Sequence, residues 1–195
     1  GKTLLEAYEK AFSCDETSAF GGIIALNKTL DKFTAKKIID NQFVEVIAAP
    51  AINPAAKKII ATKKNVRLLL VKDLFQKPTG FKTLTMNQGI LVQNVDDGAV
   101  SKKDLKVVTK KKPTSKQVND ALFAWRVGKY VKSNAIVYAK NNMTLGIGAG
   151  QMSRIDSAEI AVSKAKKAGF NLKGATMASD AFFPFRDSID EAAKN

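Results

Sequence analysis

Apolar residues along the first seventy positions alternate between strand-like and helix-like spacing. Short apolar runs at 23–27, 44–50 and 66–71 predict buried strands. Helical spacing covers 4–12, 34–42 and 55–64, and the first of these helices follows a capping pattern made by Thr3 and Glu6. The resulting β-α-β-α-β order is typical of an α/β layer with a largely parallel sheet.

The pattern weakens between positions 72 and 114, where one clear strand stands at 89–95. A long helical pattern then starts at Ser115, and its apolar positions point to a core. Further elements follow in alternation: strands at 134–140, 144–150 and 174–180, a helix from Ser153 to a stop at Gly169, and a helix near position 195. The basic, proline-containing stretch 110–115 marks a boundary, so we predict α/β parts at 1–112 and 113–195.

Composition removes several kinds of chemistry. The 195 residues contain no histidine and one cysteine, Cys14. A Cys/His zinc site and a Ser-His or Cys-His nucleophile pair are therefore excluded within this sequence. One cysteine allows no internal disulfide, and no apolar run approaches the ~20 residues of a membrane helix. These features favour a cytoplasmic protein with no membrane partner.

The formal net charge is +14, from 32 basic and 18 acidic residues. Many lysines come in pairs inside the expected amphipathic helices, which predicts solvated faces. A nucleic-acid binder should concentrate its charge on one stripe and interleave aromatic residues, so nucleic acid is the less favoured partner. A further interpretation is that the excess positive charge attracts anionic small molecules to a cleft.

The stretch "GIGAGQMSRIDSAEIA" joins an expected strand to an expected helix. Its three glycines form G-x-G-x-G, and Gln151 stands where a dinucleotide-binding loop needs its third glycine. Dinucleotide binding is therefore disfavoured, and close packing or a positive φ explains the glycines. Ser153 and Arg154 fall at a helix N-terminus, where Arg154 either binds an anion or lies on the surface.

Two loops that contain phenylalanine also allow a ligand-binding and a structural interpretation. The loop "ASDAFFPFRD" crowds three phenylalanines between carboxylates, which suits a pocket for a flat polar heterocycle. A hydrophobic plug under the last helix is the alternative. In "SAFGG", Phe20 offers a ring for stacking and Gly21 allows close approach of a ligand. The alternative there is a β-turn with a buried phenylalanine.

Four stretches, "SAFGGIIALN", "KSNAIVYAK", "GIGAGQMSR" and "ASDAFFPFRDSID", together resemble the transformylase domain of the bifunctional AICAR transformylase/IMP cyclohydrolase family. The resemblance covers essentially the whole chain. It implies three-layer α/β/α, cytidine-deaminase-like subdomains without zinc, and a homodimer with active sites across the interface. It also implies formyl transfer from 10-formyltetrahydrofolate to AICAR ribonucleotide, giving FAICAR, with IMP cyclohydrolase activity in another domain.

The resemblance also assigns roles to individual residues. Asn134 is the expected catalytic residue, and it contacts AICAR together with Arg154. The pocket-lining and substrate-binding positions that match are Phe20, Gly21, Glu45, Ile155, Phe182, Pro184 and Asp187, with Asp187 holding the folate heterocycle. Glu45 falls near the carboxamide of AICAR in a looser alignment. Ser133 and Asp180 match a potassium site of some members.

One departure from the family changes the expected activity. The family's Lys-His catalytic pair belongs to a segment upstream of "GKTLLEAYEKAF", and a Gly-rich segment containing Arg and His should follow "SIDEAAKN". We therefore expect an internal fragment that binds its substrates, AICAR and formyl-folate, but does not transfer the formyl group alone. The competing hypotheses are a zinc-free, deaminase-like module that only holds a nucleotide, and a basic nucleic-acid-binding domain.

Overall fold

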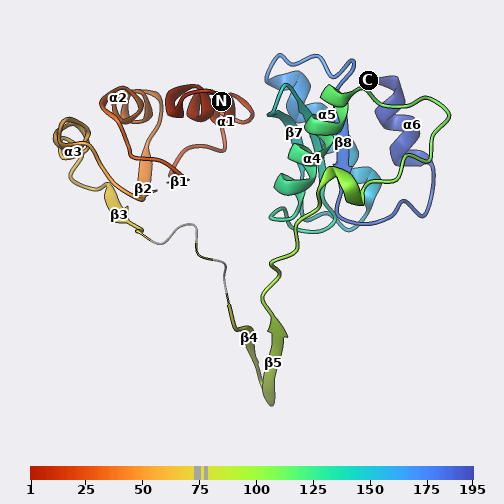
Figure 1. Cartoon of the computed structure of the whole chain (residues 1–195), viewed down its shortest axis with the longest axis horizontal. Helices are drawn as coiled ribbons and strands as arrows, with labels where there is room; N and C mark the ends of the chain where they lie inside the picture. The colour runs from red at the N-terminus through yellow and green to blue at the C-terminus, as the bar shows by residue number, and fades with distance from the viewer. Residues whose placement is uncertain (73–75, 77–78) are drawn as a thin grey trace.

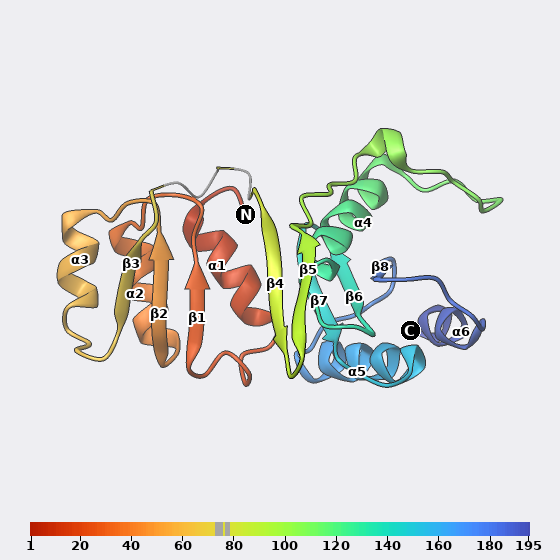
Figure 2. The same ribbon diagram turned by 90° about the horizontal axis from the view of Figure 1, so that it is seen from below.

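A parallel sheet with three helices forms the first part of the protein. The structure is a computed structural model that describes residues 1–72, 76 and 79–195. Strands β1, β2 and β3 lie in that order and pair in parallel. The helices cover one face of this sheet, and Figures 1 and 2 show them on the same side of the strands. The bounds are α1 Leu4–Ser13, β1 Gly22–Ala25, α2 Lys32–Asn41, β2 Val44–Ala49, α3 Pro54–Ile60 and β3 Arg67–Leu70.

Burial explains why this sheet has one covered face. Ile24, Ile47 and Leu68 occupy one row across the strands and pack against the helices. Full burial of a side chain such as Ile47 contributes about 1.5–3 kcal/mol. The other face is open, since Ile23 is 76% exposed and Leu69 is 51% exposed. The α/β class and the parallel order expected for this part are confirmed.

Capping side chains determine where α1 and α2 begin. Thr3 Oγ1 accepts a hydrogen bond from the Glu6 N–H at 3.1 Å, as predicted. The Glu6 carboxylate, however, accepts from the Lys2 N–H rather than from Thr3, so the capping box is displaced by one residue. Helix α2 begins two residues before its apolar pattern because the Asp31 carboxylate caps it.

An antiparallel hairpin, β4 (Phe81–Met86) with β5 (Gly89–Asn94), follows the first part. The strand expected at 89–95 is confirmed, but its partner β4 was not predicted. Every residue of both strands is exposed, and Figure 1 shows the hairpin projecting away from both sheets. Leu84 and Leu91 pair on one face while Val92 lies on the other, so both faces carry exposed apolar side chains.

The second part has three layers. Its antiparallel sheet has the order β7-β6-β8, with α4 on one face and α5 on the other. Alternate residues of β6 face the two helices: Val137 belongs to the cluster with α4, and Ile136 to the cluster with α5. The bounds are α4 Ser115–Gly128, β6 Ile136–Lys140, β7 Met143–Gly148, α5 Arg154–Lys167, β8 Thr176–Ser179 and α6 Asp187–Lys194.

A buried carboxylate stabilises the turn between β6 and β7. Asn141 and Asn142 both have positive φ, which suits a two-residue hairpin turn. The Asp120 carboxylate, from α4, accepts the N–H groups of both at 3.0 and 2.8 Å. This contact explains a charged residue on the core side of α4, where the sequence pattern indicated apolar positions alone.

A small contact joins the part that contains β1–β3 to the part that contains β6–β8. Helix α1 packs near β7, and Lys164 Nζ lies 2.6 Å from the Asp15 carboxylate. Most of the paired lysines are exposed, as expected for solvated helix faces. Among the residues described, no helix is both long and apolar enough to cross a membrane.

Candidate functional site

The carboxylate of Asp180 is the centre of a polar cluster at the end of β8. Its Oδ2 accepts a hydrogen bond from Ser133 Oγ, and its Oδ1 accepts from the Ala135 N–H at 3.0 Å. Arg154 Nη1, from the start of α5, lies 2.5 Å from Oδ1. Because β6 and β8 are antiparallel neighbours, the start of β6 and the end of β8 meet here.

These contacts determine the charge of Asp180. Burial alone would raise its pKa, but the hydrogen bonds from Ser133, the Ala135 N–H and Arg154 outweigh burial and hold the pKa below its usual 3.8. The carboxylate is therefore ionised at neutral pH, and it balances the Arg154 guanidinium. An ion pair of this kind fixes the arginine in one orientation.

Asn134 is held on three sides by the backbone and by α5. Its Nδ2 donates to the carbonyl oxygens of Gln151 and Met152, each at 3.0 Å, and its own carbonyl accepts from Ser157 Oγ at 2.7 Å. A cis peptide bond joins it to Ser133. The Asn134 Oδ1 atom accepts no hydrogen bond from any described residue, so it is available to a ligand donor.

The described residues satisfy only part of the Arg154 guanidinium. Its Nη1 donates to Ser179 Oγ at 3.1 Å as well as to Asp180, and only 12% of its side chain is exposed. Within the described residues its Nε is buried and has no hydrogen-bond partner. An unpaired buried donor costs about 1–3 kcal/mol, which a ligand acceptor would recover.

A second group of predicted residues lies in the first part, around an irregularity in β2. Gly22 pairs with Val44 and Ile23 with Val46, so Glu45 is an extra residue in its strand. Such bulges redirect side chains. A Cβ built on Gly21 would lie 3.4 Å from Glu45 Oε1, so the carboxylate and this glycine are neighbours.

Phe20, in the same group, is exposed. Its side chain is 76% exposed, and its ring lies 5.2 Å from that of Phe43. The alternative of a turn with a buried phenylalanine is therefore wrong. Gly21 has φ +72, a conformation that favours glycine. The ring is free to stack on a flat ligand.

The aromatic loop after Asp180 fits the pocket interpretation in part and the hydrophobic-plug interpretation in part. Phe183 packs against the core beside α5, as a plug would. Phe182 remains 79% exposed, and Pro184 is exposed too. Asp187 is the first residue of α6 and accepts the Ser188 N–H at 2.6 Å. Ile155 is half-buried and packs against the same core.

The structure thus brings Ser133, Asn134, Arg154 and Asp180 together. In the described part of the chain, no hydrogen bond or ion pair joins this cluster to the Phe20 group or to the loop 182–187.

The sequence did not predict two serines of the cluster, Ser179 and Ser157. Ser179 precedes Asp180 directly, and Ser157 lies one helical turn after the Ser153 cap, but a serine in either place carries little signal.

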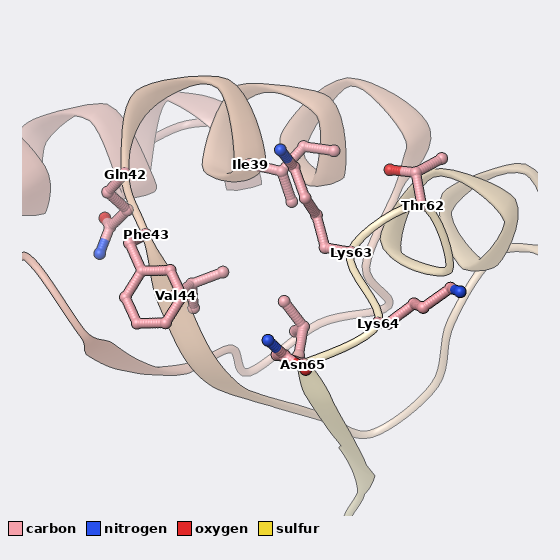
Figure 3. A pocket seen from close by; sticks show the side chains of 9 residues that line it. Ile39, Gln42, Phe43, Val44, Thr62, Lys63, Lys64 and Asn65 are labelled. Atoms are coloured by element: carbon pink, nitrogen blue, oxygen red, sulfur yellow. The ribbon is translucent and has the colours of Figure 1, made fainter.

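Cavities lie beside both groups of residues. A cleft of about 540 Å³ borders Asp180 and Ser179, and the end of α4 and the segment 96–100 form its other walls. Lys129 Nζ donates to the Gly98 carbonyl of that segment at 2.7 Å. A cavity of about 410 Å³ lies between the end of α2 and the turn before β3 (Figure 3). The first cleft is the one that the cluster reaches.

The potassium ion that the resemblance implies at Ser133 and Asp180 finds these two side chains already engaged. They are bonded to each other, and the cationic Arg154 shares the carboxylate. No group of three or more His, Cys, Asp or Glu side chains suited to a metal ion occurs in the described ranges. A potassium ion at Ser133 and Asp180 stays a prediction.

The glycines before Arg154 serve packing. A Cβ on Gly148 would overlap the Ser157 carbonyl oxygen, and one on Gly146 would overlap that of Ala161. Both glycines therefore let α5 lie directly against β7. Gly150 has φ +68. Close packing and positive φ, the two reasons expected for these glycines, are both confirmed.

Comparison with known families adds the decisive observation. A model of the AICARFT/IMPCHase bienzyme family matches residues 1–164. The chain belongs to this family. The bienzyme family consists of bifunctional enzymes of purine biosynthesis. The matched range includes Phe20, Asn134 and Arg154, to which the resemblance assigns roles, and it ends before Asp180.

Proposed function

We propose that the protein acts in formyl transfer from 10-formyltetrahydrofolate to the amine of AICAR ribonucleotide, and that the cluster around Arg154 holds AICAR. The unpaired, buried Nε of Arg154 supports this proposal best. It is a donor on a guanidinium that Asp180 already orients, so a ligand carbonyl or phosphate oxygen would complete its hydrogen bonding. Family membership supplies the choice of substrate.

The reaction explains what the remaining groups do. The amine nitrogen attacks the formyl carbon and the carbonyl electron pair moves to oxygen. That pair then re-forms the carbonyl as the bond between the carbon and N10 of the folate breaks. The amine loses a proton, and N10 gains one. Asn134 Oδ1 accepts from the attacking amine and orients it, while Arg154 holds the carboxamide or phosphate.

The AICAR amine is a weak nucleophile, because its lone pair is delocalised toward the carboxamide. Transfer therefore needs a base and a donor to the developing oxyanion. The 195 residues hold no histidine. We propose that the Lys-His pair implied by the resemblance fills both roles, and that these residues alone bind substrate without turnover.

Asn134→Ala in the full-length protein is expected to lower kcat/KM for AICAR by about 100-fold, because the amine loses its orienting acceptor. Formation of tetrahydrofolate, followed by absorbance, measures this. Asn65→Ala, at an exposed turn, is the matched control. The 195-residue chain alone should bind AICAR but show no turnover. Turnover by that chain, or unchanged activity in the Asn134 variant, would contradict the proposal.

We also propose that the protein pairs with a second copy through the β4–β5 hairpin. A two-stranded hairpin is only marginally stable on its own, and both of its faces carry exposed apolar side chains. Exposed apolar side chains gathered on one element often mark a protein–protein contact. A homodimer, which the resemblance implies, would bury these faces.

The double variant Leu84→Glu, Leu91→Glu is expected to convert dimers to monomers at micromolar concentration, because two charges would enter a paired apolar face. Sedimentation velocity measures the change. Leu105→Glu, at a leucine that is 43% exposed outside the hairpin, is the control. An unaltered protein that sediments as a monomer would refute pairing.

A further inference from the structure

The side chain of Gln42 binds the loop that carries Phe20 and Gly21. Gln42 Nε2 donates to the Ala19 carbonyl at 2.5 Å. On its other side, Gln42 Oε1 accepts a hydrogen bond from the Tyr8 hydroxyl at 3.0 Å. One amide therefore connects the buried Tyr8 of α1 to the backbone just before Phe20.

The position of Gln42 makes this link rigid. It is the C-cap of α2, and its backbone N–H bonds the Ile38 carbonyl at 3.2 Å. Figure 3 shows Gln42 and Phe43 at one end of the neighbouring cavity, at the junction between α2 and β2. Tyr8 is 6% exposed, so its hydroxyl presents a fixed donor to Oε1. The amide nitrogen is then directed to Ala19.

The neighbouring residues agree with this arrangement. A Cβ on Gly22 would lie 2.5 Å from Gln42 Nε2 and 2.9 Å from the Ala19 oxygen, so only glycine leaves room for the hydrogen bond. The Phe43 carbonyl accepts the Gly21 N–H at 2.9 Å. The Phe43 ring lies 5.2 Å from that of Phe20. The segment 42–45 thus holds the loop 19–22 through side chains, backbone and rings.

We propose that Gln42 is a positioning residue for AICAR: through its hydrogen bond to Ala19 it holds Phe20 and Gly21 beside Glu45 in the geometry that receives the ligand. This inference rests on the proposed function. Without the bond, the exposed Phe20 ring and the Gly21 backbone would sample other positions, and AICAR would have to order them on binding.

Gln42→Glu tests the inference in the full-length protein. Glutamate keeps the size of the side chain and the acceptor for Tyr8, but it has no donor for Ala19 at neutral pH. Hydrogen exchange at the Gly21 and Gly22 amides should become about tenfold faster. The KM for AICAR ribonucleotide should rise about tenfold, while kcat changes less than about threefold. Tyr8→Phe should shift both readouts the same way by a smaller factor.

Gln117→Glu is the matched control, because it makes the same change in the α4 capping box, where glutamate serves as well as glutamine. It should leave exchange and KM unchanged. Unchanged exchange in Gln42→Glu overturns the inference, and so does faster exchange with an unchanged KM. If the unaltered protein shows no turnover of AICAR, the proposed function fails, and the exchange measurement still decides whether Gln42 holds the loop.

Discussion

Gly148→Ala is expected to lower the free energy of unfolding by about 3 kcal/mol, at the upper end of the range for overpacked cores. The added Cβ would overlap the Ser157 carbonyl oxygen and lie 2.6 Å from its carbon and 2.8 Å from its Cα. These are backbone atoms of α5, which no rotamer change can move aside. The helix would have to shift away from β7, and Arg154 in its first turn would move with it.

Urea unfolding at neutral pH measures this effect, and AICAR binding should weaken in the same variant. Gly89→Ala is the control, since a Cβ there meets no atom within 4 Å. It is expected to change stability by no more than about 0.5 kcal/mol. Equal stability of the two variants would show that α5 does not lie as close to β7 as the structure has it.

Asp180→Ala is expected to cost about 3 kcal/mol of stability and to abolish measurable AICAR binding. The change removes the acceptor for three donors and leaves the Arg154 guanidinium, 12% exposed, without its counter-charge. Breaking one side of a mostly buried pair typically costs about 3–5 kcal/mol, and the remaining exposure places this case at the low end. Thermal unfolding and calorimetric titration with AICAR ribonucleotide measure the two effects.

The pH dependence of this contribution follows from the direction of the pKa shift. The folded-state pKa of Asp180 lies below 3.8, so the unfolded chain takes up the proton first as the pH falls. The contribution is complete above pH 3.8 and is lost as the pH falls through the folded-state pKa. The stability difference between the unaltered protein and Asp180→Asn should therefore be full at pH 6 and shrink toward pH 3. A difference that grows toward acid would contradict the assignment.

Local patterns predicted most of the helices and strands, because caps and apolar spacing act within a few residues. Thr3 and Ser153 cap their helices as expected, and Gly169 ends α5 with a positive φ. Strand β4 was not predicted, since polar residues interrupt its apolar ones and it is paired only to an exposed partner. The open face of the first sheet was not predicted either, because the residues of a strand do not show which elements will cover it.

The candidate site was predictable in its residues but not in its geometry. The resemblance named Asn134, Arg154 and Asp180, yet their convergence depends on which strand ends become neighbours. Glu45 approaches Gly21 because β2 carries one extra residue there, which no residue type announces. In the sequence, Gln42 is an ordinary residue at the end of a helix. Its hydrogen bonds to Ala19 and Tyr8 depend on how α1 and the loop before β1 pack against it.

The pairing of β8 with β6 limits which changes of chain length this protein can tolerate. Ser179 lies opposite Ile136, and that register alone brings Asp180 to the Ala135 N–H and to Arg154. One residue inserted within β8 would move its side chains to the opposite faces of the sheet and carry the carboxylate past its three donors. Insertions in the 168–175 connection, by contrast, would leave the pairing intact. Length variation among natural relatives should therefore gather in that connection and be absent from the four residues before Asp180.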